Sequence, residues 1–196
     1  MRSKKAIRAV FVYTLVLLFS PVLAAKGLEH SYADVGYLKF NGDDYDVSAG
    51  SVDATFGVFD ILGLRAGYIR GRTQDYPLTE DPSGKPDVAE FRLGLRPHYS
   101  FGKDFDVYAD LLYSNRKFNG DRSHTDIGWV YAGGVRWQAL DWAELNLAGE
   151  YRSGSIDAAF LVVNPVFKLT KNFDLSVKTS QSSDDADYFA GLRLKF

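Results

Sequence analysis

The sequence predicts an all-β protein, folded as a transmembrane antiparallel up-and-down β-barrel of about ten strands. Two observations lead to this class. Apolar and polar side chains alternate with a period of two residues along most of the chain, which places them on opposite faces of β-strands. Tight turns and longer polar loops alternate as connections between these segments, as expected for strands that run up and down a barrel.

Residues 1–25 have the layout of a secretory signal peptide. Basic residues precede an apolar run, Ala9–Phe19, and small residues follow, ending at Ala25. The alternative is a transmembrane anchor, but a helix needs about 20 apolar residues to cross a bilayer and this run is shorter. We therefore expect export of the chain, with residues 26–196 forming one barrel domain.

The exported part is acidic and has no cysteine. The whole chain has 23 basic and 25 acidic residues, and the N-terminal signal segment removes only basic ones. A net negative charge argues against a nucleic-acid partner. The sequence contains no metal-binding cluster, phosphate-binding loop or nucleotide fingerprint, so we expect no cofactor.

The segment Glu90–Tyr99 shows the alternation most clearly. One phase is apolar and the other carries charge at Glu90, Arg92 and Arg96. Ten segments follow this pattern to different degrees, the first three more weakly: Ser31–Phe40, Tyr45–Val58, Leu64–Arg72, Glu90–Tyr99, Phe105–Tyr113, Trp129–Gln138, Ala143–Arg152, Ala159–Leu169, Phe173–Thr179 and Tyr188–Phe196. All of them except Phe173–Thr179 reach the length of about 9–11 residues that a membrane-spanning strand needs.

Two prolines interrupt the predicted ladders. Pro97 and Pro165 each lie shortly before a tight turn, and proline cannot donate a backbone hydrogen bond to a neighbouring strand. We expect a β-bulge at each position, near the rim of the barrel.

The apolar face of every strand has two possible orientations. It could point inward, as in a soluble lipid-binding β-barrel, or outward into lipid with the charges lining the lumen. Aromatic residues cluster beside the tight turns, where a membrane interface would lie: Tyr99, Phe105, Trp137, Trp142, Phe167 and Phe173. Small residues in the polar phase also suit a crowded lumen. These features favour the outward orientation.

The chain resembles the small Gram-negative outer-membrane β-barrel proteins. It ends in an alternating strand that closes on phenylalanine, and the matching residues are Tyr188, Ala190, Leu192, Leu194 and Phe196. The resemblance implies that these residues are an assembly signal read by the barrel-assembly machinery. It also implies a place in the outer membrane, contact with outer-membrane lipid, short turns facing the periplasm and long loops outside. We expect a monomer.

The lumen-facing phase carries charges of both signs. The basic members are Arg92, Arg96, Arg136, Arg152, Lys178 and Arg193, and the acidic members are Glu90, Asp106, Asp110, Glu144 and Glu150. A barrel of about ten strands encloses little more space than side chains fill. We therefore expect a salt-bridged lumen charge network that largely plugs the barrel. A narrow porin-like channel for small solutes is the alternative.

Enzyme functions have weaker support. His98 and Ser100 have the spacing of the histidine and serine in outer-membrane lipid A deacylases, but both fall in the lumen phase. His124 and Asp126 lie in a predicted loop, Lys117–Asp126, and resemble only loosely the rim pairs of the omptin proteases. We expect a structural or surface-interaction barrel that is not an enzyme, acting through loops such as Thr73–Asp87.

Overall fold

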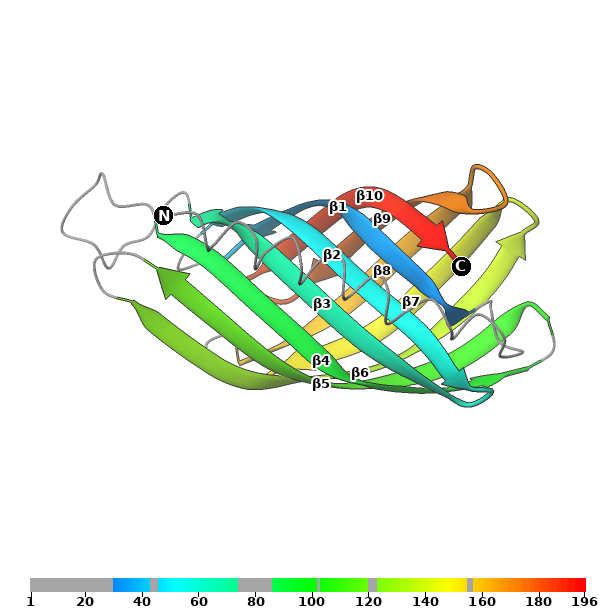
Figure 1. Cartoon of the computed structure of the whole chain (residues 1–196), viewed down its shortest axis with the longest axis horizontal. Coiled ribbons are helices and arrows are strands. Elements are labelled where there is room, and N and C mark those ends of the chain that lie inside the picture. Colours follow the sequence, from blue (N-terminus) through cyan, green and yellow to red (C-terminus); the bar gives the residue numbers. More distant parts are fainter. Residues whose placement is uncertain (1–29, 43–45, 74–85, 102, 120–122, 155–156) are drawn as a thin grey trace, which may run out of the picture.

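The computed structural model describes residues 30–42, 46–73, 86–101, 103–119, 123–154 and 157–196. Within them, antiparallel strands close into an elongated barrel whose strands are tilted against its long axis (Figure 1). The expected signal peptide, residues 1–25, lies outside the described residues. No helix in the described part of the chain is long and apolar enough to cross a membrane.

Ten strands pair in sequence order, and β1 pairs with β10 to complete the ring. Their bounds are β1 Tyr32–Asn41, β2 Asp46–Phe59, β3 Leu62–Thr73, β4 Asp87–Ser100, β5 Phe105–Asn119, β6 His124–Leu140, β7 Ala143–Arg152, β8 Ala158–Lys168, β9 Phe173–Gln181 and β10 Ala186–Lys195. The predicted fold class is confirmed.

A pair of glycines lies at the closing seam between β1 and β10. Gly36 and Gly191 are directly opposite each other. A Cβ atom on Gly36 would lie 2.3 Å from the carbonyl oxygen of Ala190, and one on Gly191 would lie 2.3 Å from that of Val35. Glycine therefore permits the close approach of the first and last strands, which leaves no open edge in lipid.

The strands β4, β5 and β6 are longer than the alternation predicted. The predicted loop Lys117–Asp126 is wrong at both ends, because β5 continues to Asn119 and β6 begins at His124. Lys117 pairs with Thr125 in this extension. Backbone pairing continues here although the apolar alternation has stopped, since a ladder outside the lipid does not need an apolar face.

The bulges predicted at the two prolines are wrong. The register of β4 with β5 is the same on both sides of Pro97, and that of β8 with β9 is the same on both sides of Pro165. In β8 the side-chain amide of Asn164 donates to the carbonyl of Val177, 2.8 Å away, which replaces a donor that proline lacks. The register shifts instead beside two tight turns, between Gly57 and Phe59 and between Trp137 and Leu140.

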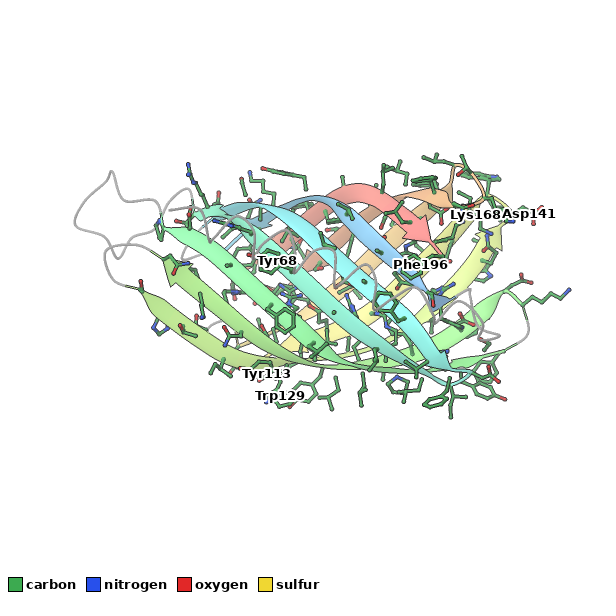
Figure 2. All side chains as sticks on the ribbon, viewed as in Figure 1. Tyr68, Tyr113, Trp129, Asp141, Lys168 and Phe196 are labelled. Carbon is green, nitrogen blue, oxygen red and sulfur yellow. The ribbon has the colours of Figure 1, made fainter. Side chains whose placement is uncertain are left out.

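The apolar phase faces outward. Leu93 is 49% exposed and Leu192 is 46% exposed, whereas the charged Glu90 and Arg193 are 3% and 4% exposed. Figure 2 shows Tyr68, Tyr113 and Trp129 on one side of Phe196 along the barrel, and Asp141 and Lys168 on the other. Exposed apolar side chains and buried charged ones exclude the soluble lipid-binding barrel, because a soluble barrel would bury its apolar face.

Candidate functional site

The lumen is the candidate site, because buried charges gather there. All eleven residues of the predicted lumen charge network lie on strands, in the phase that faces the interior. Ten of them form ion pairs within 4.0 Å in the described part of the chain. Lys178 is the exception. These pairs fall into four groups.

The seam cluster lies toward the end of the barrel that carries Phe196. Arg193 donates two hydrogen bonds of 2.9 Å to the carboxylate of Asp34, its direct neighbour across the β1–β10 seam. Its other nitrogen lies 3.4 Å from Glu144 of β7. Arg136 lies 3.0 Å from the same carboxylate and 3.8 Å from Asp106. The cluster therefore joins five strands.

The central cluster joins β2, β3, β4 and β5. Arg96 makes a bidentate contact with Asp110, with two distances of 2.7 Å. Arg65 bridges Asp110 at 2.6 Å and Asp53 at 2.9 Å. Arg96 also donates to the hydroxyl of Tyr32 at 2.6 Å. Bidentate arginine–carboxylate pairs fix both partners in one geometry, so this region of the wall is rigid.

Two smaller clusters lie closer to the long-loop end. Glu90 accepts hydrogen bonds from Arg92 at 2.5 Å and from Arg116 at 2.9 Å. On the opposite side, Arg152 contacts Glu150 and Asp187, each at 2.5 Å. The guanidinium of Arg152 also lies 4.0 Å from the ring centroid of Phe160. These cations are held by carboxylates and aromatic faces.

Several contacts cross the lumen and do not follow its wall. The Arg152–Asp187 and Arg193–Glu144 pairs each join β7 to β10, and the Arg96–Tyr32 hydrogen bond joins β4 to β1. Each pair of strands is separated by other strands along the sheet. The side chains therefore bridge the interior.

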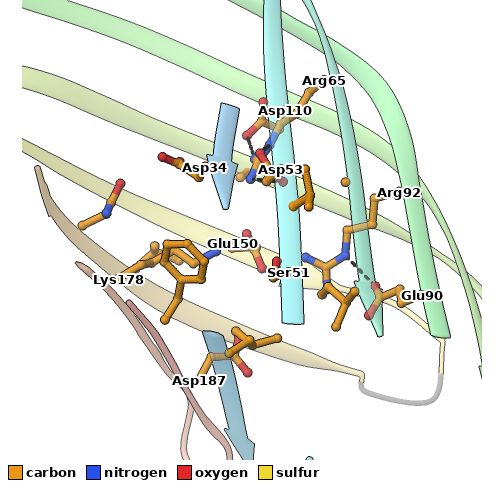
Figure 3. Close-up of a pocket in the computed structure, with 18 of the residues that line it drawn as sticks. Asp34, Ser51, Asp53, Arg65, Glu90, Arg92, Asp110, Glu150, Lys178 and Asp187 are labelled. Atoms are coloured by element: carbon orange, nitrogen blue, oxygen red, sulfur yellow. Dashed lines mark hydrogen bonds and ion pairs between the residues drawn. The ribbon is translucent and has the colours of Figure 1, made fainter. Parts of the chain in front are cut away.

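Lys178 faces a small cavity between these bridges. The cavity has a volume of about 100 Å³, and its lining includes Arg92, Glu150 and Lys178 (Figure 3). The Lys178 ammonium lies 5.8 Å from the ring centroid of Phe189 and has no ion pair within 4.0 Å among the described residues. Residues of the apolar interior such as Leu38, Phe40 and Phe189 also line it, and its volume gives room for several water molecules beside the charged side chains.

An apolar layer also lies inside the lumen, near the long-loop end. Its buried members are Leu38, Phe40, Val47, Ala49, Val88, Phe118 and Phe189, with Ile69 packed against them. They come from β1 to β5 and β10. The sequence reading missed this layer because it treated the inward phase as polar throughout. The sequence signal for the layer was the presence of apolar residues in the inward phase near the same ends of several neighbouring strands.

The sequence reading also missed part of the charge network. The omitted ion-pairing residues are Asp34, Asp53, Arg65, Arg116, Asp187 and Lys195. All have the same inward phase as the predicted members of their strands. Three of them, Asp34, Asp53 and Arg65, lie in the weakly patterned N-terminal segments. The inward phase of those segments carries charge, and this was the signal that would have identified them.

Two histidines stack at the end of the lumen near the C-terminus. The ring centroids of His30 and His98 are 3.8 Å apart, and His98 is buried. His30 precedes β1 and lies beside Asp106 and Arg136. Burial and, to a smaller extent, the charge of Arg136 together lower the pKa of His30 to about 4. The neutral imidazole is therefore the stable form at neutral pH.

The residue pairs that suggested enzymes are not assembled as catalytic sites. His98 contacts His30 and the Arg96 carbonyl, and no hydrogen bond joins it to Ser100 in the described residues. His124 lies 2.5 Å from Asp126 at the exposed rim. The comparison with the omptin proteases also involves aspartates of a second predicted loop, Asp43 and Asp44, which lie outside the described residues. No group of three His, Cys, Asp or Glu residues in the described part could hold a metal ion.

The five residues of the expected assembly signal lie on the outward face of the last strand and just after it. Tyr188, Ala190, Leu192 and Phe196 are exposed, and Leu194 is half-buried. The ring centroid of Phe196 lies 5.4 Å from that of Phe56. The backbone N–H of Phe196 donates to the carbonyl of Ser31, 3.3 Å away. The C-terminus is thus held at the seam beside β1.

No protein-family model and no curated protein sequence matches the chain. Solved structures do. The NanC porin is 11% identical, with 84% of this chain and 100% of that chain covered, at a TM-score of 0.52. The translocator domain of the autotransporter NalP from Neisseria meningitidis is 10% identical, with 98% and 97% covered, at a TM-score of 0.51. Identities this low establish the fold alone.

The closed antiparallel ring, the outward apolar face and these similar structures agree with one another. Such a surface is stable only in a bilayer, and closed barrels satisfy every backbone group there. The protein has the fold of the bacterial outer-membrane β-barrels, with an outer surface that fits a lipid bilayer.

Proposed function

We propose that the protein is a closed barrel of the structural or surface-interaction type. In this proposal the lumen does not conduct, and the barrel holds a set of loops at the cell surface. The contacts that join β7 to β10 across the interior carry the proposal: Arg152 with Asp187 at 2.5 Å and Arg193 with Glu144 at 3.4 Å. A solute would have to separate these buried charges to pass, and exposing an unpaired buried charge is costly.

The apolar layer supports the same proposal. It lies between the charged clusters and the long loops, and its phenylalanines fill the interior on the side of β1 to β5. An apolar constriction opposes the passage of hydrated ions because it offers them no hydrogen bonds.

The surface activity would then lie in the loops. The segments Thr73–Asp87 and Lys117–Asp126 are the strongest candidates, although their central residues lie outside the described part of the chain. Loops on a rigid scaffold commonly carry binding specificity. We infer a monomer that is inserted by the barrel-assembly machinery, contacts outer-membrane lipid and has no enzyme activity.

A narrow channel is the second candidate. The cavity of about 100 Å³ and Lys178 favour it, because an ammonium that forms no ion pair with a described residue could contact a passing anion. NanC is a porin, and its similarity to this chain is limited to the fold.

Single-channel recording of the refolded barrel in planar bilayers separates the two candidates. The closed-barrel proposal expects no conductance steps from the natural sequence, and steps from the double variant Arg152→Ala/Arg193→Ala, which lacks both bridges across the lumen. Steps from the natural sequence whose ion selectivity reverses in Lys178→Glu would establish the channel instead.

A further inference from the structure

A group of basic residues faces outward at the long-loop end of the barrel. Lys39, Arg70, Arg72 and Lys117 occupy the phase that faces lipid lower on β1, β3 and β5. Arg70, Arg72 and Lys117 are exposed, and Lys39 is half-buried. Beyond Lys117, from its direct neighbour Thr125 on β6 round the ring to β9, the outward positions at the same end include Ile127, Ala159 and Gln181, and none of these four residues is charged. The positive charge is therefore confined to one sector.

Small residues separate these cations. The register places Ala89 of β4 between Arg70 and Lys117, and Gly50 of β2 on the other side of Arg70. Added bulk at Gly50 would meet no atom closer than 4.0 Å, so the surface there is open. Neighbouring strands are about 4.8 Å apart. Arg70 and Lys117 thus stand about 10 Å apart across a shallow trough floored by Ala89.

Among the described residues, the side chains that flank the trough have no acceptor. Arg72 is paired with Asp87 at 3.1 Å, on an exposed surface. No hydrogen bond or ion pair joins Arg70, Lys117 or Lys39 to another described residue. The donors of Arg70 and Lys117 are therefore available to an anion from outside the protein.

The height of the trough along the barrel indicates which anion it meets. Tyr68 of β3 and Tyr113 of β5 lie on the same outward face, just before Arg70 and Lys117. Tyrosine rings of this kind lie at the boundary between hydrocarbon and headgroups. The cations one step further out are at the level of lipid headgroups.

We propose that Arg70 and Lys117, with Lys39 at the edge, form a binding site for a phosphate group of a lipid headgroup in the outer leaflet. Arginine and lysine both bind phosphate, arginine through a fork of donors and lysine as a point charge. The trough over Ala89 gives the headgroup room to approach both side chains. The site is separate from the lumen, so it stands or falls independently of the proposed closed barrel.

The test uses the full refolded barrel in detergent micelles, titrated with lipid A that carries two phosphates and followed by native mass spectrometry. The double variant Arg70→Gln/Lys117→Gln should weaken binding about tenfold to thirtyfold, given the usual contribution of a basic residue at an anionic lipid surface. Lys117→Arg should retain binding. Dephosphorylated lipid A should bind the natural protein and the double variant equally.

The matched control removes the same charge at the other end of the barrel. Lys103→Gln/Lys171→Gln changes two exposed lysines at the short turns and should leave binding within twofold. Equal binding by the Arg70/Lys117 variant and the natural protein would overturn the proposal. So would equal weakening in the control pair, which would mean a general charge effect. Displacement of lipid A by an equal concentration of inorganic phosphate would assign the site to the free anion and not to a headgroup.

Discussion

Phe189 and Arg193 lie on the same strand, β10, and face the same lumen, yet they are buried by different interactions. Phe189 packs in the apolar layer near the long loops. Arg193 is fixed by Asp34 and Glu144 toward the other end, with its guanidinium 4.0 Å from the ring centroid of Tyr32. Both residues are less than a tenth exposed.

The difference concerns what each region requires of its neighbours. An apolar side chain gains from any close packing, since the hydrophobic effect has no direction. A buried guanidinium loses its hydration and recovers the free energy only if carboxylates stand at the right positions. The charged region is therefore specified in detail, whereas the apolar layer tolerates changes that preserve its volume. Four changes would break or sharpen this contrast.

The largest effect is expected from Arg193→Met. It leaves Asp34 without its bidentate partner and Glu144 with Arg136 alone. We expect a loss of about 3–5 kcal/mol in the free energy of unfolding, because an uncompensated charge stays buried. Urea unfolding of the barrel in lipid vesicles, followed by tryptophan fluorescence, measures it. The double variant Asp34→Leu/Arg193→Leu should recover most of the loss; a double variant as unstable as the single one would argue against the ion pair as the cause.

Leu38→Ala tests the apolar layer in the same assay. Leu38 is buried against the phenylalanines of the layer, and its truncation leaves a cavity. We expect a loss of about 2–5 kcal/mol. Leu38→Met keeps the volume and should cost less than about 1.5 kcal/mol. If the methionine variant were as damaging as the alanine variant, the layer would be as strictly specified as the charged region.

Leu147→Arg tests the outward orientation on which both regions depend. Leu147 is 39% exposed on the outer face of β7, between the two ends of the strand. An arginine facing the middle of the bilayer should cost about 2–4 kcal/mol. The comparison variant is Thr125→Arg, beyond the lipid at the loop end, where about 0–1 kcal/mol is expected. Equal costs at the two positions would contradict the depth assigned to Leu147.

The smallest effect is expected from pH acting on His30. Its pKa is lowered to about 4 in the folded protein, below the ordinary value of 6.5 in the unfolded chain. The unfolded chain therefore takes up the proton first, and stability present above pH 6.5 is lost as the pH falls toward 4. The loss reaches up to about 3 kcal/mol. His30→Gln should remove this part of the pH dependence between pH 7 and 4; an unchanged profile would mean that His30 is solvated in solution.

The sequence by itself determined the class of fold, the outward apolar face and the number of strands. Period-two alternation suffices for this because one residue of shift reverses every side chain of a strand. It also placed each of the eleven network residues in the inward phase, from Glu90 to Arg193. The last strand was also predicted from the alternation alone, as Tyr188–Phe196, and in the structure it spans Ala186–Lys195.

Only the tertiary structure decided which charges meet and where the lumen is apolar. The partners of Arg152 and Arg193 come from strands that are not neighbours in the sheet, and their meeting depends on the tilt and curvature of the closed ring. Likewise, Phe40, Phe118 and Phe189 are far apart in sequence and form one layer only after closure. A period of two fixes the face on which a side chain lies, but not its height along the barrel or the side chain that it meets across the lumen.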